Sequence, residues 1–246
     1  MPEVIALESK KTYLVPIVVL ILCCLAFLLL SYLSCTKIDQ IASRLAGEQT
    51  PVMVIDPGHG GEDGGTSGSS VLEKDVNLAI SLQLKRLLEI SGLHVVMTRT
   101  EDVSISDSGL GTVRERKASD IHNRLKIIEA HGENCIFISI HQNHFTESKY
   151  NGAQMFYSTK NAASKEIAEC IRSRIVSLVQ PENKRENKPA TSSIFLLWNT
   201  KVPAVLVECG FLSNQTEAAN LSSPDYQKKL ALAMCSGVLD YLHSEP

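Results

Sequence analysis

The chain has 246 residues, of which 44% are hydrophobic and 21% are charged, and its net charge at pH 7 is −3. This composition is typical of a globular protein and excludes an intrinsically disordered chain. The small net charge gives no support to a nucleic-acid partner. The seven cysteines form no C-x-x-C pair, so the sequence predicts neither a disulfide scaffold nor a thiolate zinc site.

A long apolar run near the N-terminus, 14–33, carries no charged residue and follows Lys10 and Lys11. Its length matches the ~20 residues with which an α-helix crosses a bilayer. No A-x-A cleavage site follows it, which favours a retained anchor over a cleaved signal peptide. Only Lys37 lies close behind the run, so the positive-inside rule puts the N-terminus in the cytoplasm and the bulk of the chain outside.

These observations predict four parts of the chain. They are a cytoplasmic tail at 1–13, a transmembrane signal anchor at 14–33, a juxtamembrane spacer at 34–50 and a catalytic domain at 51–246. A lipoprotein signal ending at Cys35 is the alternative for the N-terminal part. The preceding Tyr-Leu-Ser sequence matches a lipobox poorly, so we favour the anchor.

From residue 51 onward, short aliphatic runs alternate with longer amphipathic segments. The expected strands lie at 52–55, 94–98, 136–140, 152–157, 193–197 and 204–207. The expected helices lie at 73–90, 116–131, 162–179 and 224–242, with a charged loop at 182–188. This alternation predicts a single α/β domain with a mostly parallel, twisted sheet of about six strands and helices on both faces.

Three expected strands run directly into residues that can bind a metal or move a proton. The first ends in the glycine-rich loop DPGHGGEDGG, which holds His59, and two others end at His141 and Glu208. Because the carboxyl ends of parallel strands share one edge of a sheet, we expect these side chains to lie close together. Two imidazoles and a carboxylate at one edge suggest a metal, with zinc in first place.

A catalytic zinc ion usually takes three protein ligands and leaves a fourth position for water. His59 and His141 supply two of them. The candidates for the third, all acidic, are Glu62, Asp63, Glu73 and Glu208. Glu73 opens the first long helix, whose first turn must return to this edge, and this choice would leave Glu208 free as a general base. Glu73 could instead close a capping box with Ser70.

Other interpretations of these residues remain open but are weaker. The glycine-rich loop could hold phosphate, yet it has neither a G-x-G-x-x-G nor a Gly-Lys-Ser/Thr sequence. Cys209 could act as a nucleophile, yet strand alternation points it away from the side that Glu208 faces, so we place it in the core. His144 could contact a substrate, although an exposed loop position is the simpler explanation.

Five sequence blocks, in this order and spacing, resemble the zinc-dependent N-acetylmuramoyl-L-alanine amidases of the amidase_3 family. The blocks are IDPGHGGEDGG, LEKDVNLAI, VVMTR, FISIHQN and VECGFLSN, and the similarity extends over 52–242. With its single N-terminal span and compact domain, the chain is most similar within the family to the membrane-anchored amidases of the spore cortex and of germination in endospore-forming bacteria.

The resemblance implies a role for each matching residue of the site. The implied residues are the zinc ligands His59, Glu73 and His141, the catalytic acid/base Glu208 and the substrate-binding Asn143. Basic positions of the family without an implied role are matched by Arg99, Arg116 and Arg124. One zinc ion per chain is the implied cofactor.

The implied activity is hydrolysis of the amide bond between N-acetylmuramic acid and L-alanine in peptidoglycan, in spore-cortex maturation, by a domain held outside the cytoplasm by its membrane anchor. The alternatives are a zinc peptidase that cuts within the stem peptide and a non-catalytic peptidoglycan-binding module. Residues 157–193 hold one ordinary helix and a short loop, so we do not expect an inserted autoinhibitory helix. The sequence shows no wall-binding repeat, so targeting is expected from the anchor or from an activating or targeting partner protein.

Overall fold

The structure is a computed structural model that describes residues 19–20, 22–27, 31, 50–67 and 71–244. The chain divides into two units, Met1–Gln49 and Thr50–Pro246. In the first unit the described residues are helical, and no helix built from described residues is long and apolar enough to cross a membrane. The expected tail (1–13) and most of the expected span (14–33) and spacer (34–50) lie outside the described residues.

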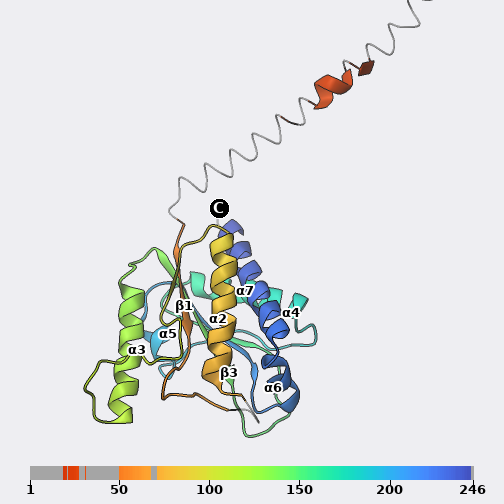
Figure 1. The fold of residues 1–246 in the computed structure, drawn as a ribbon. Coiled ribbons are helices and arrows are strands. Elements are labelled where there is room, and N and C mark those ends of the chain that lie inside the picture. The colour runs from red at the N-terminus through yellow and green to blue at the C-terminus, as the bar shows by residue number, and fades with distance from the viewer. Residues whose placement is uncertain (1–18, 21, 28–30, 32–49, 68–70, 245–246) are drawn as a thin grey trace, which may run out of the picture. The chain divides into compact units, whose positions relative to one another are not determined.

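The second unit is built on one sheet, in which β1 and β3 are labelled in Figure 1. The sheet has six strands in the order β2-β1-β3-β6-β4-β5. The strands are β1 (Val52–Pro57), β2 (Val95–Met97), β3 (Cys135–Asn143), β4 (Gln154–Tyr157), β5 (Lys188–Pro189) and β6 (Ala204–Phe211). The first four strands in this order pair in parallel, and β4 runs antiparallel to β6. The predicted α/β domain with a mostly parallel sheet of six strands is therefore confirmed.

Helices cover both faces of this sheet. One face carries α2 (Glu73–Ile90), α4 (Ala163–Leu178) and α7 (Pro224–Ser244), and the other carries α3 (Val113–Glu129) and the short α5 (Phe195–Asn199). Side chains of β1 alternate between the two cores: Met53 and Ile55 pack on the α2 side, and Val54 packs on the α3 side. Because both faces are covered, the central strands are aliphatic throughout, as is usual for parallel sheets.

The same alternation decides which side of the sheet each strand-end residue faces. Phe137 of β3 and Leu206 of β6 belong to the α3-side core, so His141 and Glu208, an even number of residues further on, face that side too. His141 and Glu208 are also direct partners in the β3–β6 register. Cys209 packs in the opposite core, and burial raises the pKa of its thiol, so it stays a core residue as predicted.

One expected strand, 193–197, was wrong: these residues lead into the helix α5. A short apolar run does not distinguish a buried strand from a buried helix by its periodicity. Here a single helical turn places Leu196 and Leu197 in the α3-side core. The sixth strand is instead β5, which falls at the end of the expected charged loop 182–188 and pairs with β4 at the edge of the sheet.

The short helix α6 (Gln215–Leu221) is missing from the sequence expectations. The Asn214 side chain caps it by accepting hydrogen bonds from the backbone N–H groups of Thr216 and Glu217. An asparagine in this position is a common helix-start signal, so the sequence did carry a sign of this helix.

Candidate active site

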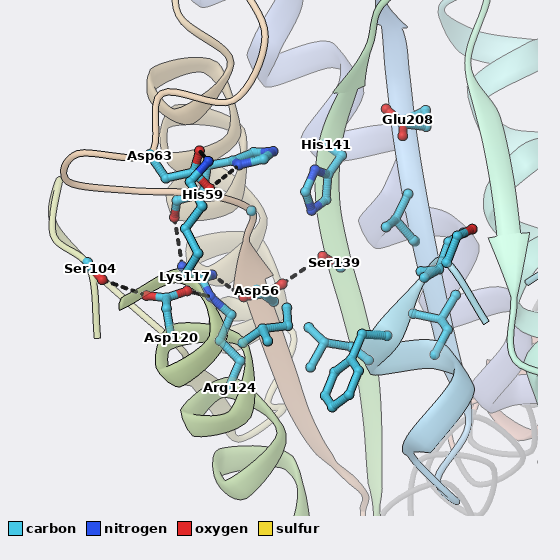
Figure 2. Close-up of a pocket in the computed structure, with 18 of the residues that line it drawn as sticks. Asp56, His59, Asp63, Ser104, Lys117, Asp120, Arg124, Ser139, His141 and Glu208 are labelled. Carbon is cyan, nitrogen blue, oxygen red and sulfur yellow. Dashed lines mark hydrogen bonds and ion pairs between the residues drawn. The ribbon is translucent and has the colours of Figure 1, made fainter. Parts of the chain in front are cut away.

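The carboxyl ends of β1, β3 and β6 open onto a cleft of 380 Å³ on the α3 side of the sheet (Figure 2). The predicted residues His59, His141 and Glu208 all line it. One wall is polar and comes from the glycine-rich loop and α3. The opposite wall is apolar and includes Leu196 and Leu197 of α5, so the corrected helix forms part of the site.

His59 lies in the loop after β1 and has a backbone φ of 63°. Among the residues that the structure describes, it is the one non-glycine residue with a left-handed backbone conformation. Such a conformation is uncommon outside glycine and is often kept where function requires it. Two buried arginines hold the backbone of this loop by hydrogen bonds to its carbonyls. Arg124 donates to the His59 carbonyl (2.7 Å), and Arg99 donates to the Gly58 carbonyl (3.0 Å).

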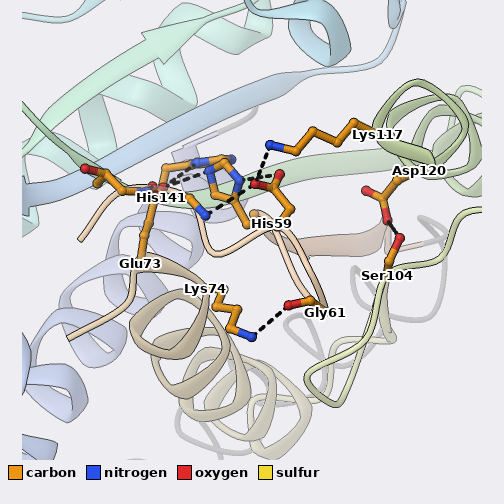
Figure 3. Close-up of polar contacts among 12 residues, drawn as sticks. His59, Gly61, Glu73, Lys74, Ser104, Lys117, Asp120 and His141 are labelled. Atoms are coloured by element: carbon orange, nitrogen blue, oxygen red, sulfur yellow. Dashed lines mark hydrogen bonds and ion pairs between the residues drawn. The ribbon is translucent and has the colours of Figure 1, made fainter. Parts of the chain in front are cut away.

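Glu73 lies between the two predicted imidazoles (Figure 3). Its Oε1 is 2.8 Å from Nδ1 of His141 and 3.2 Å from Nε2 of His59. The rings of His59 and His141 meet edge to face, with their centroids 4.9 Å apart. One potential ligand atom from each of the three residues lies within 4.8 Å of the others. The sequence expectation that these side chains converge is met.

The carboxylate of Glu73 is buried and its orientation is fixed by backbone donors. Thr66 N–H donates to Oε2 (2.8 Å), and Gln142 N–H donates to Oε1 (3.1 Å). The alternative role of Glu73 in a capping box finds no support, because the N-cap of α2 is Leu72, with no side-chain cap hydrogen bond. Ser70, the expected cap, lies outside the described residues.

The charges around this cluster favour a cation. Burial by itself would lower the pKa of His59, but the carboxylates of Asp63 and Glu73 outweigh it and raise that pKa to about 9. Burial would likewise raise the pKa of Glu73, but hydrogen bonds from His141 and His59 hold it well below its usual range. Two imidazoles and one buried carboxylate are also the ligand set of many catalytic zinc sites. The residues present therefore fit a zinc ion.

Two of the other three acidic candidates for the third ligand, Glu62 and Asp63, have other partners. Glu62 forms a bidentate ion pair with Arg116 of α3. Asp63 contacts His59 at Nδ1, on the opposite side of the ring from Glu73. Among the acids of the loop and the first turn of α2, Glu73 is thus the one that joins both imidazoles.

Glu208 lies beside His141 on the neighbouring strand (Figure 2). Its Oε2 is enclosed and has no hydrogen-bond partner among the described residues. Burial raises the pKa of Glu208 to about 7, with a further increase from the Glu73 charge and a decrease from the two imidazoles. A carboxyl group with such a pKa can both accept and donate a proton near neutral pH.

A model of the Amidase_3 family, described as N-acetylmuramoyl-L-alanine amidase, matches residues 53–240. The chain belongs to this family. A germination-specific N-acetylmuramoyl-L-alanine amidase of Bacillus subtilis is 38% identical over 190 residues, which are 77% of this chain and 79% of the relative. The enzyme class predicted from the sequence blocks, an N-acetylmuramoyl-L-alanine amidase, is confirmed by this membership.

Solved structures in the family share the fold. The CwlD amidase from Clostridioides difficile, in complex with the GerS lipoprotein, is 40% identical with a TM-score of 0.76, over 79% of this chain and 100% of that chain. The AmiC2 amidase of Nostoc punctiforme is 30% identical with a TM-score of 0.66, over 80% of this chain and 99% of that chain.

Two of the remaining predicted residues lie at the end of β3. The backbone carbonyl of Asn143 accepts a hydrogen bond from Leu212 N–H, and Asn143 is not among the residues that line the cleft. Its binding of substrate stays a prediction. His144 is exposed, as the simpler interpretation held.

From the sequence, Asn77 was missed as part of the site and Arg124 was given no role. Asn77, one turn after Glu73 on α2, donates to the Gly58 carbonyl (3.1 Å) and accepts from Gln142 Nε2 (3.1 Å). Its i+4 spacing from Glu73 places it on the same side of the helix, which was a usable signal. Arg124 carried a clearer signal, because it lies beside Ile121 on the apolar face of its helix.

Proposed function

We propose that this family member hydrolyses the amide bond between N-acetylmuramic acid and L-alanine of peptidoglycan, using a zinc ion held by His59, Glu73 and His141. The observation that carries the proposal is the convergence of these three side chains beside a cleft that His59, His141 and Glu208 line. A bound zinc ion would supply a Lewis acid that polarises the scissile carbonyl and makes water more acidic.

In this mechanism Glu208 is the group that moves the proton. It takes a proton from the attacking water and later gives it to the amine of L-alanine as the amide bond breaks. A pKa of about 7 suits both steps. The Glu208 carboxylate is then a stronger base than the carboxylate of an exposed glutamate, and the protonated Glu208 can still donate its proton near neutral pH.

The proposal extends to the place of action. The similarity to a germination-specific relative supports a substrate in the spore cortex. The uncharged run 14–33, preceded by lysines, supports a membrane anchor with the catalytic unit outside the cytoplasm. A structural relative was solved with a lipoprotein, which supports a search for a protein partner of this chain as well.

Digestion of purified peptidoglycan by the zinc-loaded protein, with masses of the products, tests the proposed activity. We expect intact stem peptides that begin with L-alanine, together with glycan strands free of peptide. Fragments cut within the stem would instead establish a zinc peptidase. Tight binding of peptidoglycan without turnover, in the presence of a candidate partner as well, would establish a non-catalytic binding module.

The variant His59→Ala tests the metal site directly. Loss of one of three ligands should weaken zinc binding by more than about 100-fold, because even residues that only orient a ligand contribute 10–100-fold. Zinc content after dialysis against a weak chelator, measured by mass spectrometry, reports the effect. His144→Ala is the matched control, since it removes an exposed histidine three residues after His141. Unchanged zinc stoichiometry in His59→Ala would remove His59 from the ligand set.

The variant Gly58→Ala tests how closely the loop is fitted to His141. A Cβ at position 58 would lie 2.2 Å from Nε2 and Cε1 of the His141 ring, so the ring must move. We expect kcat/KM to fall by about 100-fold, the order of loss that a shift of 1 Å in a catalytic group can cause. Gly111→Ala is the control, because the nearest atom there is 3.8 Å away. Equal activities for the two variants would contradict this prediction.

A further inference from the structure

His59 uses its two ring nitrogens for two different carboxylates. Nδ1 is 2.8 Å from Oδ2 of Asp63 (Figure 2), and Nε2 is 3.2 Å from Oε1 of Glu73 (Figure 3). A carboxylate only accepts hydrogen bonds, so a neutral His59 that keeps its bond to Asp63 must carry its proton on Nδ1. The lone pair is then on Nε2, and it points toward Glu73, where the other candidate ligands converge.

Asp63 is itself held in place. Lys117 Nζ lies 2.8 Å from Oδ1, the carboxylate oxygen that does not contact His59. The backbone of Asp63 pairs with that of Gly60 in both directions, at 2.9 and 3.1 Å, which closes the loop around His59. Asp63 therefore presents a fixed acceptor to the imidazole, with each of its two oxygens engaged by a different partner.

The loop around Asp63 is also tied to its surroundings at both ends. Lys74 Nζ donates to the Gly61 carbonyl (2.8 Å, Figure 3), and Lys74 N–H donates to the Gly64 carbonyl (3.3 Å). Gly61 N–H in turn donates to Asp102 (2.8 Å). These contacts fix the backbone independently of the Asp63 side chain. A change confined to the Asp63 carboxylate should thus leave the loop in place.

We propose that Asp63 is a positioning residue that fixes the tautomer and the ring orientation of His59, so that Nε2 is presented to the metal. The inference rests on the proposed metal site. Asp63 does not act as a ligand here, because its carboxylate lies on the Nδ1 side, outside the cluster of His59, Glu73 and His141. A carboxylate that receives the second N–H of a metal-bound histidine is a recurrent arrangement in metalloproteins.

The loop contains its own matched control. Glu62 precedes Asp63, carries the same charge and pairs with Arg116 instead of with the imidazole. The Glu62 side chain is 39% exposed and that of Asp63 is 26% exposed, so neither is a core residue. Glu62→Ala and Asp63→Ala remove the same charge from neighbouring positions, and only the second removes the acceptor for Nδ1 of His59.

The test measures zinc affinity of the purified full chain by competition with a chelator, for wild type, Asp63→Ala, Asp63→Asn and Glu62→Ala. We expect Asp63→Ala to weaken zinc binding 10–100-fold. Glu62→Ala should bind zinc like wild type. The zinc affinity of Asp63→Asn should lie between those of Asp63→Ala and Glu62→Ala. The asparagine amide oxygen can still accept a hydrogen bond from Nδ1 of His59, but it carries no charge. Equal losses in the Ala variants at both positions, or wild-type affinity in Asp63→Ala, would overturn the proposal.

A second measurement reports on the tautomer itself. Nitrogen-15 NMR of the zinc-free protein, at a pH where the imidazole is neutral, should show His59 protonated at Nδ1 in wild type and in Glu62→Ala. Asp63→Ala should shift His59 toward the Nε2-protonated form. An unchanged His59 tautomer in Asp63→Ala would overturn the proposal even if the zinc affinity of that variant fell. Because this readout needs neither zinc nor peptidoglycan, failure of the proposed amidase activity would show up separately, as wild-type protein that does not cleave the substrate.

Discussion

Glu208→Gln should abolish amide hydrolysis while leaving the fold and the metal ligands in place. Glutamine has nearly the same shape, so the β3–β6 pairing of His141 with position 208 should survive. It cannot accept the proton of the attacking water, and it cannot donate one to the leaving amine. A well-placed general acid or base contributes about 10²–10⁴-fold to a rate, and one residue serves in both steps here. We therefore expect kcat to fall by at least about 10³-fold.

Release of L-alanine-terminated peptides from peptidoglycan, alongside zinc content and a thermal unfolding curve, measures this effect. The zinc content and the unfolding midpoint should match those of wild type. Glu147→Gln is the control, because Glu147 is an exposed acid on the loop that follows β3 and pairs with Lys149. If Glu208→Gln kept full activity with zinc bound, the proton would have to be moved by another group.

The placement of these residues was largely predictable from the sequence. Aliphatic runs that end at His141 and Glu208, within an alternation of strands and helices, bring both to one edge of a parallel sheet. The alternation of side chains along β6 also predicted correctly that Glu208 and Cys209 face opposite sides of the sheet. Local rules suffice for these points, because the period of a strand determines which neighbours share a face.

The choice among the acidic residues was not predictable in this way. Residue spacing left Glu62, Asp63, Glu73 and Glu208 open as the third ligand, and the resemblance to the family favoured Glu73. The contacts that separate them, such as the pair of Glu62 with Arg116, join residues that are 54 positions apart in the chain. The apolar wall of the cleft was misassigned for a related reason. The four apolar residues at 194–197 fit a strand or a helix equally well until the core beneath them is known.

The buried ion pair between Asp56 and Arg124 illustrates the same limit and has a large expected effect. Both side chains are at most 2% exposed, and Nη1 of Arg124 lies 2.5 Å from Oδ1 of Asp56. Burial would raise the pKa of Asp56, but Arg124 and the hydroxyls of Thr98 and Ser139 hold it below its ordinary value. The ionised Asp56 therefore contributes its full stabilisation at neutral pH. This contribution is lost as the pH falls below 3.8, the ordinary pKa of an aspartate.

Arg124 connects this ion pair to the catalytic loop. Its guanidinium donates to the carbonyls of Pro57 (2.9 Å) and His59 (2.7 Å) as well as to Asp56. Removal of the guanidinium leaves a buried carboxylate and two buried carbonyls with fewer donors. Breaking a buried pair by removing one partner costs about 3–5 kcal/mol, because the remaining charge is uncompensated.

We expect Arg124→Met to lower the free energy of unfolding by about 3–5 kcal/mol at pH 7. Chemical denaturation of the full chain, followed by circular dichroism, measures this change. Arg174→Met is the control, because Arg174 pairs with Asp240 at the surface, where such pairs contribute about 0–1 kcal/mol. Addition of Asp56→Asn to Arg124→Met should restore part of the lost stability, since it removes the unpaired buried charge. If the double variant were as unstable as the sum of the two single variants, the loss would come from the other contacts of Arg124, with the two carbonyls and with Asp120, and not from its pairing with Asp56.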